Sequence, residues 1–353
     1  MLSAIDPMLR PDLGSKEACM ELGQVVLDAT TVVEIVQSLA EKLKANYVFP
    51  DVAEQICARL QYHLDDGAYA NSPDGEFLAF ALTTHLQEVN QDEHLWVKWT
   101  PEPLPEQEGA LRENEAWLAE RRQRAELDNY GLHGVERLPG NVGYLDIRRF
   151  EKPEWGGDTA AAAMSFLAQA EALIVDLRKC TGGYPDMVVL ISSYLFGEEP
   201  VHLNSMYWRD EDATQQYWTL PYVPGQRLGD KPVYVLTSKD TFSGGEEFAY
   251  NLQSRQRATL VGETTGGGAH AGASYRLHPH FEAFIPMGRA INPITQANWE
   301  GRGVVPDVPV PAEQALDVAY RMALESVLER AGEAESGPFR WLVAEAEAAL
   351  GGS

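Results

Sequence analysis

The first hundred residues alternate apolar and polar positions with a helical period. Apolar side chains recur at three- and four-residue steps over 33–43, and the same stripe returns over 52–64 and 77–86. The residues that we expect to cap these three helices are Thr30 or Thr31, Asp51 and Asp74. In the third helix we expect Phe77, Leu78, Ala81, Leu82 and Leu86 to point inward. Three short amphipathic helices in succession predict a small helical domain over residues 1–100.

The period then shortens to two. Leu95, Val97 and Trp99 alternate with Trp96 and Lys98, which is typical of a strand. Residues 101–140 begin with charge and proline and continue as an exposed helical pattern, and we interpret them as a linker or a cap.

From residue 142 onward, short apolar runs alternate with helical patterns. The strands that we expect are 142–147, 172–178, 232–238 and 258–263. The helices that we expect are 158–170, 185–196, 244–254, 312–331 and 338–349. Buried strands separated by helices predict a layered α/β domain over residues 141–353.

Composition agrees with a folded protein and excludes one class of partner. The chain has 353 residues, of which 44% are hydrophobic and 23% are charged, so a sizeable core can form. Its formal net charge is −25. Such a surface repels phosphate backbones, so we expect no nucleic acid partner, although acidity can also serve solubility alone.

The cysteines and the N-terminus indicate neither a cofactor site nor a targeting segment. The three cysteines are Cys19, Cys57 and Cys180, and no C-x-x-C spacing occurs, so we expect neither a metal nor another cofactor. The N-terminus lacks a basic start followed by an apolar run, and no stretch approaches 18 apolar residues. We therefore expect a cytoplasmic protein without a membrane span, although removal of a secretory signal would leave the same sequence.

Ser243 lies where an expected strand turns into an expected helix. Ser243 and Glu246 have the S-x-x-E spacing of a capping box, so the serine could simply cap the helix. The same place suits a nucleophile, because free N–H groups at a helix N-terminus can bind an oxyanion. Gly244 and Gly245 would let a substrate carbonyl approach closely.

A second strand, at 172–178, ends near Gly182 and Gly183. These glycines could provide another oxyanion donor, or they could form an ordinary strand–helix turn.

A serine nucleophile needs a base and a group that orients the base. The histidines considered for this role are His94, His270, His278 and His280. A lysine base downstream of Ser243 is excluded, because the last lysine is Lys239. Glu300 lies in a glycine-flanked segment that could hold a carboxylate rigidly, or it could be a surface turn residue.

Six segments in this order resemble the tail-specific, or C-terminal-processing, serine protease family. They are DEHLWV, GNVGYLDIRRF, DLRKCTGG, TFSGGEEFAYNLQ, RATLVGETTGGGAHAG and WEGRGVVPDV, within roughly residues 25–325. The resemblance is greatest to the branch with the tricorn protease core and the modules of interphotoreceptor retinoid-binding protein. It implies a ClpP/crotonase-like domain of stacked ββα units preceded by a helical domain.

The resemblance also assigns roles. It implies Ser243 as nucleophile, His94 as general base and Glu300 as its partner. It implies an oxyanion hole formed by the N–H of Gly244 with that of Gly182 or Gly183. The pKa of His94 is expected to be raised by Glu300 and by Glu93.

Two departures from the family limit what carries over. Gly268 stands where the bacterial enzymes of the family have the lysine of a Ser–Lys dyad. The interval 101–140 is too short for the peptide-binding PDZ domain of those enzymes, which puts processive recognition of protein C-termini in doubt.

The function that we expect is a serine peptidase that forms an acyl-enzyme. Its substrate would be a peptide or a small apolar molecule, and a homo-oligomer stays open. The alternatives are a non-catalytic retinoid- or lipid-binding module of the same fold and a crotonase-like acyl enzyme. Tryptophans and tyrosines at 207–222 could line an apolar pocket, or could serve core packing and strand pairing.

Overall fold

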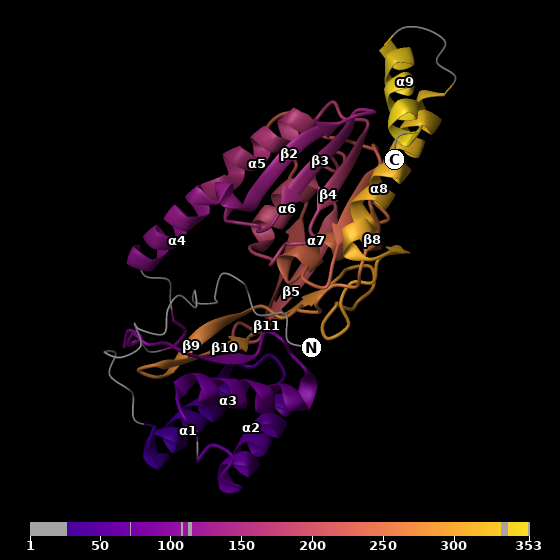
Figure 1. The fold of residues 1–353 in the computed structure, drawn as a ribbon. Helices are drawn as coiled ribbons and strands as arrows, with labels where there is room; N and C mark the ends of the chain where they lie inside the picture. The colour runs from indigo at the N-terminus through magenta and orange to yellow at the C-terminus, as the bar shows by residue number, and fades with distance from the viewer. Residues whose placement is uncertain (1–26, 71, 107–108, 112–114, 333–337, 352–353) are drawn as a thin grey trace, which may run out of the picture.

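A computed structural model gives the arrangement of the chain (Figure 1). It describes all residues except 1–26, 71, 107–108, 112–114, 333–337 and 352–353. Cys19 therefore lies outside the described residues. The α/β class with helices at the start is confirmed, because three helices precede a mixed six-stranded sheet.

The first three helices pack into one unit, with bounds α1 Ala29–Asn46, α2 Pro50–Asp65 and α3 Gly75–Asn90. Asp74 caps α3 as expected, since its Oδ1 accepts the Phe77 N–H at 2.8 Å. The other two caps are wrong. Asp28 caps α1 by accepting the Thr31 N–H, and α2 begins with Pro50, whose fixed φ suits the first helical position.

The core of this helical unit is completed by strands from distant sequence. Strand β1 (Trp96–Trp99) pairs antiparallel with β10 (Phe281–Pro286), which pairs with β9 (Gly272–His278). Tyr275 and Phe281 of this three-stranded sheet are buried with the inner faces of α1–α3. The inward position expected for Phe77 is wrong, because its side chain is 49% exposed.

The larger unit is built on a six-stranded sheet with the order β12-β8-β7-β4-β3-β2. All pairs are parallel except β2 with β3. The strand bounds are β2 Leu132–Leu138, β3 Val142–Ile147, β4 Ala172–Asp176, β7 Val233–Thr237, β8 Thr259–Gly262 and β12 Val308–Pro309. Strands β4 and β7 are buried along their whole length, as expected for central strands covered on both faces.

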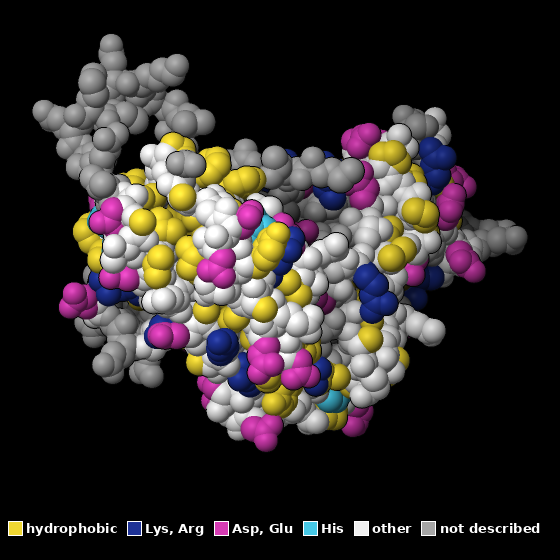
Figure 2. Space-filling view, turned by 90° about the horizontal axis from the view of Figure 1, so that it is seen from below, with side chains coloured by type: hydrophobic (Ala, Val, Ile, Leu, Met, Phe, Trp, Pro, Cys, Tyr) yellow, Lys and Arg dark blue, Asp and Glu magenta, His cyan; other side chains and the backbone are white. Residues whose placement is uncertain are grey.

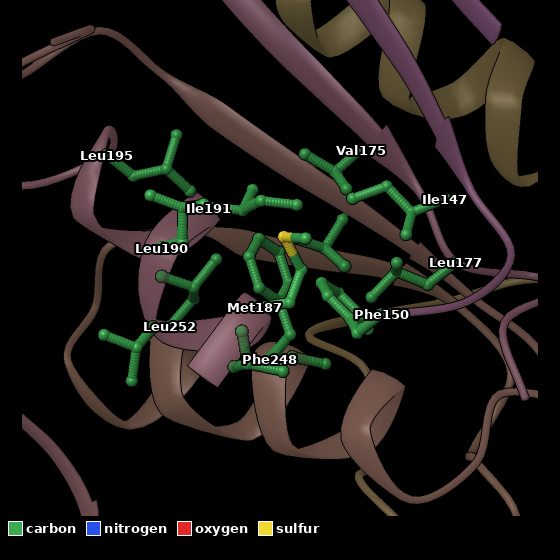
Figure 3. Close-up of a cluster of buried hydrophobic side chains, with 14 of the residues drawn as sticks. Ile147, Phe150, Val175, Leu177, Met187, Leu190, Ile191, Leu195, Phe248 and Leu252 are labelled. Carbon is green, nitrogen blue, oxygen red and sulfur yellow. The ribbon is translucent and has the colours of Figure 1, made fainter. Parts of the chain in front are cut away.

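Helices cover both faces of this sheet (Figure 1). Their bounds are α4 Glu115–Leu127, α5 Pro153–Leu167, α6 Pro185–Ser193, α7 Gly244–Ser254, α8 Ala315–Ala331 and α9 Pro338–Gly351. On one face, α5, α6 and α7 enclose a core around Phe150, Met187 and Phe248 (Figure 3). On the other face, α8 and α9 bury a separate apolar cluster against the strands. Short 3-10 turns lie at Asn129–Gly131 and Ala312–Gln314.

A third sheet lies between the two units. It has the order β11-β5-β6, with bounds β5 His202–Trp208, β6 Ala213–Trp218 and β11 Gly288–Ile291. Strand pairing is thus the role of much of the aromatic segment at 207–222, while Tyr222 is 76% exposed and lines no core.

The surface carries mixed chemistry. The face seen from below shows acidic, basic and apolar side chains interspersed (Figure 2). Among the described residues, the search for a helix with the length and hydropathy of a membrane span finds none.

Candidate active site

Ser243 occupies a strained turn between β7 and α7. Its backbone has φ 50° and ψ −116°, a combination outside the regions that L-residues favour. Such a conformation costs on the order of 1–3 kcal/mol and persists where the surrounding structure enforces it, often at active sites. The serine therefore sits at the N-terminus of α7 in a conformation that an ordinary cap does not require.

Glu246 holds this turn from inside the protein. Its Oε2 accepts the N–H groups of Ser243 and Gly268, both at 2.8 Å, and its Oε1 accepts the Gly267 N–H at 2.7 Å and the Thr265 hydroxyl at 2.5 Å. Burial raises the pKa of Glu246 to about 7 against these four donors. One carboxylate thus fixes the serine turn to the glycine loop that follows β8.

Gly182 and Gly183 lie against the same serine turn. An ideal Cβ at Gly182 would lie 2.8 Å from Ser243 Cβ, and one at Gly244 would lie 3.0 Å from the Gly183 nitrogen. Within the described part of the chain, the Gly183 N–H donates to no protein acceptor. This N–H next to Gly244 is therefore available to a ligand oxygen.

The His94 ring lies close to the residues on either side of the serine turn. The ring centroid is 4.6 Å from that of Phe242, the residue before Ser243. An ideal Cβ at Gly268 would come 2.5 Å from His94 Cε1. His94 Nδ1 is buried and has no hydrogen-bond partner among the described residues. The lysine of a Ser–Lys dyad would have no room at position 268, because the imidazole occupies that space.

The charge expected for His94 is wrong. Burial lowers its pKa to about 4, and the nearby Asp92 carboxylate only partly opposes this effect. The charge of Glu93 does not contribute to the pKa shift of His94, contrary to expectation. The imidazole is therefore neutral at physiological pH, which is the form that accepts a proton.

Asp92 is a residue that the sequence analysis missed. Its Oδ1 accepts the backbone N–H of His94 at 3.1 Å, and its Oδ2 lies 2.9 Å from Nδ1 of His270 and 2.8 Å from the Tyr47 hydroxyl. Burial alone would raise the pKa of Asp92. The hydrogen bond to His270 and the charge of His270 outweigh burial and hold this pKa below its usual range. Because an ionised carboxylate only accepts, Nδ1 of His270 must carry a proton.

Glu300 joins this network through His270. Its Oε2 lies 3.4 Å from His270 Nδ1 and accepts the Ala269 N–H at 2.6 Å. Among the hydrogen bonds of the described residues, none joins Glu300 to His94. Burial and the neighbouring Asp92 raise the pKa of Glu300, which favours its protonated form. Glu300 Oε1 is buried without a hydrogen-bond partner within the same residues.

Among the residues that the structure describes, two groups of side chains could hold a metal ion. One is Asp92, His270 and Glu300, and the other is His63, His85 and Glu88 on α2 and α3. In each group the donor atoms lie within 4.8 Å of one another. The first group is already linked by the His270 proton, and the stacked rings of the second, 3.6 Å apart, direct their nitrogens in parallel rather than toward one point.

Among the described residues, neither His278 nor His280 has a hydrogen bond or ring contact with the serine turn. His278 lies in β9, and His280 follows it and bonds the Thr100 carbonyl. Cys180 lies under the glycine turn, and burial raises the pKa of its thiol to about 12, so it is no nucleophile. Asp92 could have been suspected from its place two residues before His94, but nothing in the sequence signals its bond to His270.

Comparison with known proteins gives the context of this site. Residues 141–310 match the model of peptidase family S41, and residues 17–127 match the model of the N-terminal domain of peptidase S41 in eukaryotic IRBP. A carboxyl-terminal-processing protease of Synechocystis sp. is 28% identical over 217 residues, which are 58% of this chain and 48% of that protein. The chain thus spans about half the length of this curated relative.

Two solved structures share the fold. A suspected peptidase from Parabacteroides merdae superposes with a TM-score of 0.57 at 18% identity, over 83% of this chain and 96% of that one. The tricorn protease superposes with a TM-score of 0.50 at 15% identity, over 82% of this chain and 35% of that one. Both the helical unit and the sheet unit have counterparts in these comparisons, and the chain belongs to peptidase family S41.

Proposed function

We propose that this protein is a serine peptidase in which Ser243 is the nucleophile and His94 the general base. The observation that carries the proposal is the strained Ser243 backbone at the start of α7, next to the unpaired Gly183 N–H and the neutral His94. Acyl transfer needs a serine beside oxyanion donors and a neutral base, and the strained backbone supports a functional role for this serine.

In the first half-reaction, Ser243 Oγ would attack the carbonyl carbon of a peptide bond while its proton passes to His94. The N–H groups of Gly183 and Gly244 would stabilise the oxyanion of the tetrahedral intermediate. That intermediate would collapse as His94 protonates the leaving amine, which gives an acyl-enzyme on Ser243. In the second half-reaction, water attacks the ester with His94 again as base, and the peptide acid is released.

The carboxylates of Asp92 and Glu300 would act on the positive charge that His94 gains during the reaction. When His94 gains a proton, Asp92 offers the nearest negative charge, because it holds the His94 backbone and lowers the cost of the buried imidazolium. Glu300 contacts His270, and no hydrogen bond among the described residues joins it to His94. In this proposal Glu300 acts as a positioning residue through His270 rather than by direct contact with His94.

A fluorophosphonate probe tests the proposal, because it reacts only with an activated serine. We expect covalent labelling of wild-type protein that is lost in Ser243→Ala and strongly slowed in His94→Ala. Ser165→Ala is the control, since Ser165 is exposed on α5 and lies outside the turn between β7 and α7. Labelling of wild type that persists in Ser243→Ala, or no labelling at all, contradicts the assignment.

A binding module without catalysis is the second candidate, and the match of residues 17–127 to the IRBP model favours it. The cleft beside Glu300 is lined by apolar side chains together with arginine, histidine and amide groups, so its lining alone does not distinguish a polar ligand from a retinoid. Saturable binding of a fluorescent fatty acid by a protein that the probe does not label would favour the binding module.

A further inference from the structure

A cleft of about 670 Å³ opens beside Glu300 and His270 of the candidate site. Its lining comes from β11 and from the helical unit. Figure 1 shows β11 in the middle of the molecule. The lining residues that carry its chemistry are Phe49, Asn90, His270, Arg289, Glu300 and Arg302. Two arginines and a histidine face one glutamate there, in a chain with 53 acidic and 28 basic residues.

Arg289 is held rigidly between two aromatic rings. Its Cζ lies 5.5 Å from the centroid of Phe49, which comes from the helical unit, and 5.4 Å from that of Tyr207. Tyr207 is its direct cross-strand partner in the β11–β5 pair, and the Tyr207 hydroxyl donates to Asp212 at 3.0 Å. A guanidinium stacked in this way keeps its N–H donors free in the plane of the group.

No acceptor uses those donors. Arg289 Nε is buried and unpartnered, and among the described residues no carboxylate forms an ion pair with this arginine. The nearby Arg209 differs, because it donates to the backbone carbonyls of Lys44 and Tyr47. A pre-oriented guanidinium without a partner suits a carboxylate, which accepts two parallel N–H bonds.

We propose that this cleft binds a carboxylate of a peptide, with Arg289 as the fixed partner and the exposed Arg302 as a second positive charge. The carboxylate would come from an acidic side chain or from a free C-terminus. Glu300 does not repel it, since burial and Asp92 favour the protonated Glu300. As a substrate subsite this rests on the proposed peptidase function, whereas the binding itself does not.

The test uses the full chain with Ser243→Ala, so that bound peptide is not cleaved. It compares three peptides that differ only at one side chain and at the C-terminus. One has a glutamate and an amidated C-terminus, one has glutamine and a free C-terminus, and one has glutamine and an amidated C-terminus. Calorimetry should show at least one carboxylate peptide binding about tenfold or more tightly than the neutral peptide. The peptide that gains identifies the source of the carboxylate.

Three further variants decide whether Arg289 is responsible. Arg289→Gln should reduce the preference to about onefold, and Arg289→Lys should restore little of it because lysine lacks the planar fork. Arg122→Gln removes the same charge from the surface of α4 and should keep the preference. If Arg289→Gln does not fold, Arg302→Gln at the exposed position should still weaken the preference.

Equal binding of all three peptides overturns the proposal, as does a preference that survives Arg289→Gln in folded protein. Neither result bears on the peptidase function, which the fluorophosphonate probe tests on its own.

Discussion

The two sides of the candidate site are built differently. The side of the proposed nucleophile consists of turns that follow β4, β7 and β8, three parallel strands of the six-stranded sheet, and Glu246 ties the Ser243 turn to the loop after β8 by hydrogen bonds to backbone groups. On the side of the proposed base, titratable side chains join Asp92, His270 and Glu300 from three distant segments, and Asp92 holds the backbone of His94. Local turn geometry therefore fixes the nucleophile, while tertiary contacts and protonation govern the base.

The largest expected effect tests whether the two sides act as one unit. Members of a catalytic unit lose similar amounts of rate when removed singly. We expect Ser243→Ala and His94→Ala each to lower kcat/KM for a peptide or ester by about 10³-fold or more. Hydrolysis of the same substrate by both purified variants, with circular dichroism to check folding, gives the comparison. If His94→Ala keeps most of the rate, His94 is not the base and His270 is the next residue to test.

The nucleophile side should be sensitive to Glu246. Glu246→Ala leaves the buried N–H groups of Ser243, Gly267 and Gly268 without their acceptor. Each unsatisfied group costs about 1–3 kcal/mol, so we expect the free energy of unfolding to fall by about 3 kcal/mol or more. Urea unfolding measures it, with exposed Glu313→Ala as the control. A fall in the free energy of unfolding below about 1 kcal/mol would show that water replaces the carboxylate. The turn around Ser243 would then be no more rigidly held than the surroundings of His94.

Gly268 lies between Phe242, which precedes Ser243, and His94. A Cβ there would overlap His94 Cε1 and the Phe242 ring, so Gly268→Ala should displace the base while Ser243 stays in place. We expect a loss of activity of about 10- to 100-fold with a smaller loss of stability. Gly197→Ala is the matched control, because nothing lies within 4 Å of its added Cβ. Equal rates for the two variants would place His94 away from the reaction.

The smallest expected effect concerns protonation on the base side. The folded-state pKa of Glu300 is raised above its ordinary value of 4.5, so the stability that it contributes is full below that value and declines as pH rises through the folded pKa. Glu300→Gln should therefore lose less stability between about pH 5 and 8 than wild type, by roughly 1–3 kcal/mol. Urea midpoints at both pH values measure this, and Glu313→Gln should behave like wild type. An unchanged slope in Glu300→Gln means that Glu300 is already ionised.

The sequence predicted best what local periodicity controls. The bounds of β3 and α7 agree with the expected 142–147 and 244–254, because a buried strand and a capped amphipathic helix leave clear patterns. The pairing of β1 with β10 was not expected, since these strands lie about 180 residues apart and no short-range signal records such pairing. The boundaries proposed at 100 and 140 stay predictions.

The same limit applies to the site. Ser243 and its glycines lie on turns that short motifs reveal, and they do lie together. Asp92 and His270 are 178 residues apart, so their bond could not be predicted from spacing. The pKa of His94 was expected to rise because only charges are visible in a sequence, whereas burial decides its direction in the folded protein.

The pairing of β1 with β10 has a consequence for the order in which the protein is made. The core of α1–α3 includes Phe281 and Ile285, so this unit cannot complete its packing until the chain has been synthesised past residue 286. His94 lies two residues before β1, and its setting depends on that pairing. On the ribosome, α1–α3 would therefore wait until residue 286 has been synthesised before their core is complete, and the surroundings of His94 would form only then.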